Sequence, residues 1–162
     1  MKPTRRISPP GTYFVTSCTW QRRSLFQSER IARLFLQTLN KYRRGGKFQL
    51  HAFVLMPDHF HLLLTPAQDV PLERALQLIK GGFSHASKTE LRCNLEIWER
   101  GFTDHRIRDA QDFAHHRDYI HQNPVAAAIV VIASEYRYSS AYPGFKLDAW
   151  PSAAEAGLAT GA

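Results

Sequence analysis

Apolar residues along the chain follow two spacings, one typical of strands and one typical of helices. Strand-like or extended runs, rich in β-branched and aromatic residues, occupy 12–20, 48–56, 59–65 and 96–108. Helical spacing predicts one helix over 28–44 and another from Asp69 to Phe83. The order β-α-β-β-α-β predicts an α+β fold of the ferredoxin-like type, in which both helices cover one face of an antiparallel sheet.

Residues at the ends of these two helices fit their expected boundaries. Ser28 and Asp69 are expected N-caps, because their side-chain oxygens can accept hydrogen bonds from the first turn. Gly45-Gly46 is expected to end the first helix, and Gly81-Gly82 to bend the second.

A further helix is expected after the sheet, capped by Asp109 and ending near Asn123, because Pro124 cannot continue it. A short second helix is expected over 125–130, followed by an irregular aromatic and serine-rich segment. From about residue 148 the chain is rich in Ala, Gly, Ser and Pro without periodicity, which predicts disorder. The sequence thus predicts one domain, 1–147, and a disordered tail, 148–162.

Two histidines, His59 and His61, stand one residue apart within an apolar run. Alternate side chains of a strand point to the same face, so both are expected on the open face of the sheet, away from the helices. Two neutral imidazoles there could bind one metal ion. Two half-buried histidines bonded to backbone or water are the alternative, which we favour for such a pair on its own.

The composition of the chain limits the kinds of molecule that the protein is expected to bind. The net charge of +7 favours a polyanion, either nucleic acid or an anionic membrane surface. No run reaches the roughly 18 apolar residues expected of a membrane span. The basic N-terminus precedes Pro and Gly rather than an apolar run, so no signal peptide is expected. Cys18 and Cys93 show no zinc-ligand spacing and are compatible with a reducing cytosol.

Tyr119 and Asn123 are four residues apart on the last expected helix and therefore share a face. A tyrosine hydroxyl can act as a nucleophile, and an amide oxygen could complete a metal site begun by two histidines. The alternative for Tyr119 is a packed ring with a solvated hydroxyl. The neighbouring histidines are interpreted as surface or capping groups, namely His115, His116 and His121.

Several segments resemble one family of proteins. Residues 56–64, Met-Pro-Asp-His-Phe-His-Leu-Leu-Leu, resemble the histidine–hydrophobe–histidine (HUH) motif of single-tyrosine transposases. Residues 119–125, Tyr-Ile-His-Gln-Asn-Pro-Val, resemble a motif of the REP-associated tyrosine transposases. Shorter similarities occur in the same order at 98–102, 107–109 and 139–141. The resemblance spans about residues 11–145.

Two positions depart from the family pattern. Asp58 stands where the family usually has Asn, and Ala126-Ala127-Ala128 replaces a basic residue and a glycine. Neither change removes a proposed catalytic group, although the second could alter contacts with the substrate.

The resemblance implies a metal-dependent enzyme that nicks and rejoins single-stranded DNA at hairpin-forming repeats, through a 5′-phosphotyrosine at Tyr119. It implies Mg²⁺ or Mn²⁺ bound by His59, His61 and Asn123, a cytoplasmic, nucleoid-associated location, and a monomer or homodimer without membrane contacts. Basic residues are candidate phosphate contacts, namely Arg5, Arg6, Arg22, Arg23, Lys80, Arg106 and Arg108.

Two other functions remain open at this point. One is a domesticated protein that binds repeat hairpins without cutting them, although such a binder would not need all four catalytic groups. The other is a metal phosphodiesterase that uses water, in which Tyr119 is structural.

Overall fold

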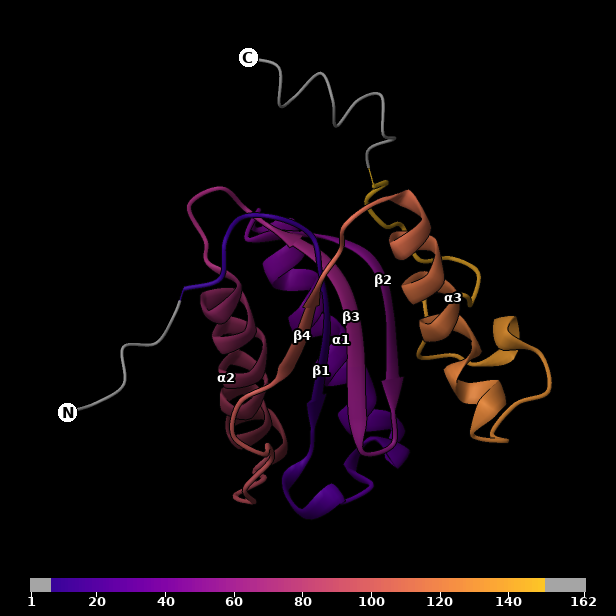
Figure 1. The fold of residues 1–162 in the computed structure, drawn as a ribbon. Coiled ribbons are helices and arrows are strands. Elements are labelled where there is room, and N and C mark those ends of the chain that lie inside the picture. Colours follow the sequence, from indigo (N-terminus) through magenta and orange to yellow (C-terminus); the bar gives the residue numbers. More distant parts are fainter. Residues whose placement is uncertain (1–6, 151–162) are drawn as a thin grey trace.

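The computed structural model describes residues 7–150 (Figure 1). Four strands form one antiparallel sheet in the order β2-β3-β1-β4. The main elements are β1 (Tyr13–Cys18), α1 (Glu29–Arg44), β2 (Phe48–Met56), β3 (His59–Pro66), α2 (Leu72–Leu91), β4 (Thr103–Arg106) and α3 (Ala110–Ala126). The expected α+β class with an antiparallel sheet is confirmed.

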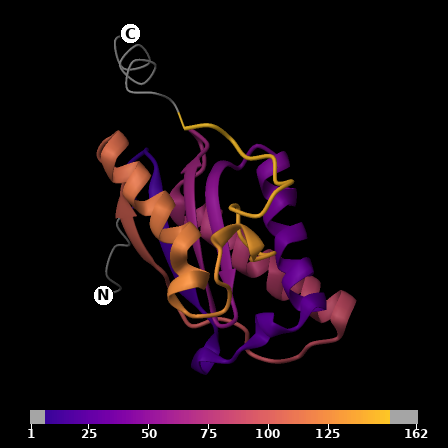
Figure 2. The same ribbon diagram turned by 90° about the vertical axis from the view of Figure 1, so that its right-hand side faces the viewer.

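The sheet is covered on both faces (Figure 2). α1 and α2 pack on one face, whereas Ile120 and Phe113 of α3 pack on the other, against Val54 and Leu63. The expectation that the second face is open was therefore wrong. The physical reason lies in β2, where residues 52–56 are buried on both faces and need a partner on each.

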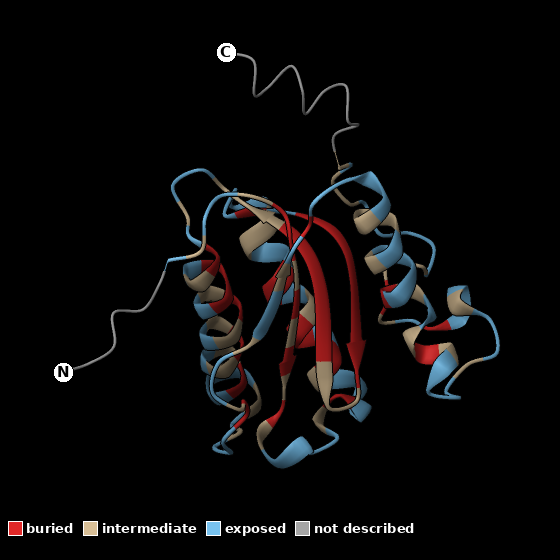
Figure 3. Cartoon of the chain, viewed as in Figure 1, coloured by how far each residue is buried: buried red, intermediate tan, exposed pale blue. Residues whose placement is uncertain are grey.

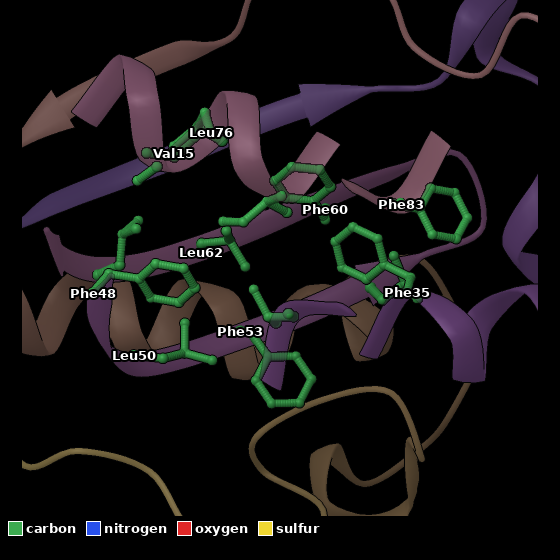
Figure 4. Packing of buried hydrophobic residues seen from close by; sticks show 14 of the residues in the cluster. Val15, Phe35, Phe48, Leu50, Phe53, Phe60, Leu62, Leu76 and Phe83 are labelled. Atoms are coloured by element: carbon green, nitrogen blue, oxygen red, sulfur yellow. The ribbon is translucent and has the colours of Figure 1, made fainter. Parts of the chain in front are cut away.

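The larger core lies between the sheet and the helices α1 and α2. Its aromatic centre joins Phe35 of α1 to Phe60 of β3, with ring centroids 5.1 Å apart, and Phe83 of α2 packs 5.5 Å from Phe35 (Figure 4). Strands β2 and β3 are buried over nearly their whole length (Figure 3). This core makes β3, which carries both histidines, a rigid support.

The helix boundaries confirm some expected caps and correct others. Ser28 accepts a hydrogen bond from the Ile31 amide, and Asp109 accepts one from the Asp112 amide, as caps should. Asp69 does not cap α2, whose N-cap is Pro71 without a side-chain hydrogen bond. The Pro71 carbonyl accepts hydrogen bonds from the Arg74 and Ala75 amides, so backbone groups alone close the first turn.

α2 continues through Gly81 and Gly82 as one helix. The expected end of α3 and the short helix expected after it were wrong. α3 includes Pro124 in its last turn and ends at Ala126, and no separate short helix occupies 127–130. Pro124 costs the helix one backbone hydrogen bond, but its ring is buried, and the Ala127 amide still closes the turn on the Asn123 carbonyl.

The segment after α3 returns to the edge of β2. The Leu55 amide donates to the Tyr138 carbonyl, and Ser140 bonds both backbone groups of Phe53. Asp148 and Trp150 are also packed, whereas residues 151–162 of the expected disordered tail lie outside the described residues. None of the helices in the described part of the chain has the length and apolar character needed to cross a membrane.

Candidate active site

Strand pairing places His59 and His61 on the face of the sheet that α3 covers. His61 lies opposite Thr16 of β1, and His59 lies opposite Cys18, so their side chains share this face. The two imidazole centroids are 4.8 Å apart. His61 is buried, with 5% of its surface exposed, whereas His59 is half-buried. The expected juxtaposition of the two rings is present, but in a covered site.

Each histidine is oriented by a hydrogen bond at the same ring nitrogen. Nδ1 of His59 lies 2.7 Å from Oδ1 of Asp58, and Nδ1 of His61 lies 2.7 Å from the Thr16 hydroxyl. Such bonds fix the ring orientation and favour ligation through the other nitrogen. Nε2 of both rings has no hydrogen-bond partner among residues 7–150, so both are available to an ion.

The electrostatics keep one imidazole neutral and the neighbouring carboxylate charged. Burial, followed by the charges of His59 and Arg22, lowers the pKa of His61 to about 3. Partial burial of Asp58 acts to raise its pKa, but the His59 hydrogen bond and the Arg22 guanidinium outweigh it and lower the pKa below its usual value. A neutral imidazole is the form that binds metal ions.

Tyr119 of α3 lies beside this pair. Its ring centroid is 5.5 Å from that of His61 and 5.9 Å from that of Phe14, which itself stacks on His61 at 5.3 Å. Half of the Tyr119 surface is exposed, so a substrate in solution can reach it. Asn123 is half-buried one turn further along the same helix. α3 therefore brings a phenol to the covered histidine pair.

The candidate phosphate contacts are spread over different surfaces. Arg22 is close to the histidines, because its Nε bonds Oδ2 of Asp58 at 3.0 Å, and Arg23 beside it is exposed. Arg106 lies opposite Tyr13 and so faces the helix side of the sheet. Lys80 donates to the carbonyls of Glu99 and Gly101.

Two of the remaining candidates cannot be placed, and one is exposed. Arg5 and Arg6 lie outside the described residues. The side chain of Arg108 is exposed, with its Nε 3.7 Å from Asp112.

Sequence patterns missed a second group of polar side chains, His105, Asp112 and His116. The donor atoms of these three residues lie within 4.8 Å of one another, close enough to hold a metal ion. His116 was expected to be a surface or capping residue; it is half-buried, and its Nδ1 lies 2.8 Å from the Asp112 backbone carbonyl of its own helix. The spacing of Asp112 and His116 along one helix was a signal for contact, but His105 joins them only through the pairing of β4 with β1.

Comparisons with known proteins agree with these motifs. The sequence profile of the family described as "Transposase IS200 like" matches residues 11–123, which include both histidines, Tyr119 and Asn123. A REP-associated tyrosine transposase of Escherichia coli (strain K12) is 33% identical over 132 residues, covering 80% of this chain and 76% of that protein.

Two solved structures are similar in fold. One, described as a REP-associated tyrosine transposase bound to a REP hairpin, is 28% identical, with a TM-score of 0.71 and 96% coverage of each chain. The other, from Deinococcus radiodurans, is 19% identical, with a TM-score of 0.52 and coverage of 74% of this chain and 95% of that one. At that identity the second likeness concerns the fold alone.

Proposed function

The chain belongs to the IS200-like transposase family, and on that premise we propose that it cuts and rejoins single-stranded DNA at hairpin-forming repeats, with Tyr119 as the nucleophile. The observation that carries this proposal is the position of Tyr119, half-exposed and 5.5 Å from the His61 ring. A phenol and two imidazoles lie there together, and Asn123 follows Tyr119 by one turn of the same helix.

We assign the arrangement of β1 to β4 with α1 and α2 to the ferredoxin-like type, with α3 as an additional helix that carries the nucleophile. The strand and helix order supports this assignment. Residues up to about 147 then form one HUH transposase-like catalytic domain. The proposed place of action is the bacterial cytoplasm, at the nucleoid.

The donor set of the site fits a divalent metal ion. Nε2 of His59 and of His61 would hold it together with the Asn123 side chain, because Nδ1 of each ring is already bonded. An ion bound there supplies Lewis-acid polarisation of a DNA phosphate. Nitrogen ligands favour Mn²⁺ over Mg²⁺, whereas oxygen ligands suit Mg²⁺, so both are candidates.

Tyr119 performs the covalent step. Its oxygen forms a bond to phosphorus while the bond from phosphorus to the 3′ oxygen of the preceding nucleotide breaks. The phenol loses its proton and the leaving oxygen gains one, so the products are a 5′-phosphotyrosine and a free 3′-hydroxyl. Attack by another 3′-hydroxyl reverses the step and joins two strands. The retained phosphotyrosine bond makes a high-energy cofactor unnecessary.

The proposal that the partner is DNA rests on the net charge of the chain and on its similarity to a DNA-bound structure. The net charge of +7 favours a polyanion, and the similar structure noted above is described as bound to a REP hairpin. Among the candidate phosphate contacts, Arg22 bonds Asp58 beside His59, and Arg23 follows it in the chain. Contacts of this kind add affinity that falls with salt, because bound counterions are released from the DNA.

A labelled hairpin oligonucleotide with a single-stranded flank tests this function. In Mn²⁺ we expect the wild-type protein to form an adduct that survives denaturation, and Tyr119→Phe to bind the DNA with similar affinity but to form no adduct. Cleavage by Tyr119→Phe would instead identify water as the nucleophile, and hence a phosphodiesterase. Tight binding without cleavage by the wild-type protein would identify a hairpin-binding protein.

A further inference from the structure

His105, Asp112 and His116 form a compact cluster between β4 and α3. Nε2 of His105 lies 2.8 Å from Oδ2 of Asp112, and Nδ1 of His116 lies 3.1 Å from Oδ1 of the same carboxylate. The two imidazole rings stack with their centroids 4.6 Å apart and their planes 17° from parallel. Nδ1 of His116 also lies 2.8 Å from the backbone carbonyl oxygen of Asp112, a bond that an ion at this nitrogen would have to replace.

This donor set is one that transition metals use. Two imidazole nitrogens and one carboxylate oxygen occur in zinc sites with an open fourth position for water. Ligands about 2.0–2.1 Å from a tetrahedral zinc ion lie about 3.3 Å from each other, and the donor atoms of these three residues all lie within 4.8 Å of one another. We propose that these three residues form a metal site for a divalent transition ion such as Zn²⁺, separate from His59 and His61.

The residues around the cluster hold its side chains in place, as the neighbours of metal ligands do. Asp112 also accepts a hydrogen bond from the Arg108 amide at 2.9 Å, which fixes its carboxylate. Phe14 packs 4.9 Å from the His116 ring and holds it from the sheet side. The Asp112 side chain is 10% exposed, whereas that of His105 is 39% exposed. The site thus has a buried base and a solvent-facing side by which an ion and a water ligand can enter.

The position of the site indicates what an ion would do there. His105 comes from the edge strand β4, whereas Asp112 and His116 are four residues apart in the first half of α3. An ion at this point would clamp the start of α3 to the sheet. Tyr119 follows His116 by three residues on the same helix, and both rings contact Phe14. The clamp would therefore stabilise the helix that positions the tyrosine without contacting the DNA phosphate.

The test is a Co²⁺ titration of the full-length chain without an affinity tag, in the variant His59→Ala/His61→Ala. We expect one bound equivalent with the absorption bands of four-coordinate Co²⁺, displacement by Zn²⁺, and a melting temperature that rises with Zn²⁺ concentration. Adding His105→Ala should abolish all three signals. Adding His115→Ala is the matched control, because His115 neighbours His116 but is exposed, and it should change none of them.

Each result decides the proposal. A folded double variant that binds no Co²⁺, or that binds it equally well after His105→Ala, overturns the site. If the double variant does not fold, the wild-type protein and the single variant His105→Ala are compared directly. A loss of one Co²⁺ equivalent supports the site, and unchanged stoichiometry overturns it. Because the titration does not measure DNA cleavage, its failure leaves the proposed transposase function untouched.

Discussion

Asp58 accepts a hydrogen bond at 2.7 Å from Nδ1 of His59, the next residue in the chain. The same carboxylate pairs with Arg22 at 3.0 Å, so it is held from two sides. A carboxylate behind a histidine fixes the ring and strengthens its outer nitrogen as a ligand. Asp58 thus orients one of the two proposed metal-binding rings, although it would not contact the ion itself.

Removing this support should weaken metal binding at the proposed catalytic site. Asp58→Ala is expected to lower Mn²⁺ affinity about 10- to 100-fold, which is the usual effect of losing such a partner. Asp58→Asn keeps an oxygen acceptor and should lose less. The measurement is the Mn²⁺ dependence of hairpin cleavage, with the exposed Asp69→Ala as control. Wild-type Mn²⁺ dependence in Asp58→Ala would exclude the orienting role.

His61 should also matter for stability, because it is buried. His61→Ala removes a ring that packs on Phe14 and Tyr119 and leaves the Thr16 hydroxyl without its partner. We expect a loss of about 2 kcal/mol in the free energy of unfolding, from lost packing and an unpaired polar group. Urea denaturation measures it, with exposed His115→Ala as the control. Equal stability of His61→Ala and wild type would show that the ring does not support the fold.

Much of the site could be predicted because its signals are local. Alternation along a strand places His59 and His61 together, and helical spacing does the same for Tyr119 and Asn123. The caps Ser28 and Asp109 follow from the preference of helix starts for side-chain oxygens. Each of these inferences needs only a few consecutive residues.

The missed features depend on how distant segments meet. α3 has few apolar positions, so its packing on the sheet was not evident from its own pattern. The informative signal was in β2, whose residues 52–56 are apolar without alternation, as in a strand buried on both faces. His105 and Thr16 join their partners through strand register, which one sequence does not specify.

Alanine substitutions at two adjacent glycines of α2 are expected to change the stability of the protein in opposite directions. A Cβ at Gly82 would lie 2.5 Å from the Tyr42 hydroxyl of α1, whereas a Cβ at Gly81 would meet nothing within 4 Å. Gly82→Ala is therefore expected to destabilise the protein by about 1–3 kcal/mol through overpacking. Gly81→Ala should stabilise it by up to about 1 kcal/mol, because alanine favours helix. Thermal melts of both variants check the pair, and a shift of the same sign in both would refute the close approach of the helices.

Asp148 anchors the C-terminal segment to the domain through charge. Its two carboxylate oxygens accept hydrogen bonds from Nε and Nη2 of Arg43 at 2.9 and 3.0 Å, and one also accepts from the Leu50 amide. The Arg43 hydrogen bonds, opposed by partial burial and aided by the Leu50 amide, lower the pKa of Asp148 below its usual value. The folded state therefore holds the ionised carboxylate more strongly than the unfolded state does.

The lowered pKa of Asp148 determines the direction in which the free energy of unfolding changes with pH. A group whose pKa is lower in the folded state adds stability above its unfolded pKa, about 3.9 for Asp, and loses it as the pH falls through the folded pKa. Asp148→Asn should thus cost about 1–3 kcal/mol at pH 7, and the difference from wild type should shrink below about pH 4. Urea denaturation between pH 7 and pH 3 measures it, with exposed Asp69→Asn as control. A deficit that stays constant over this range would mean that Asp148 acts through shape rather than charge.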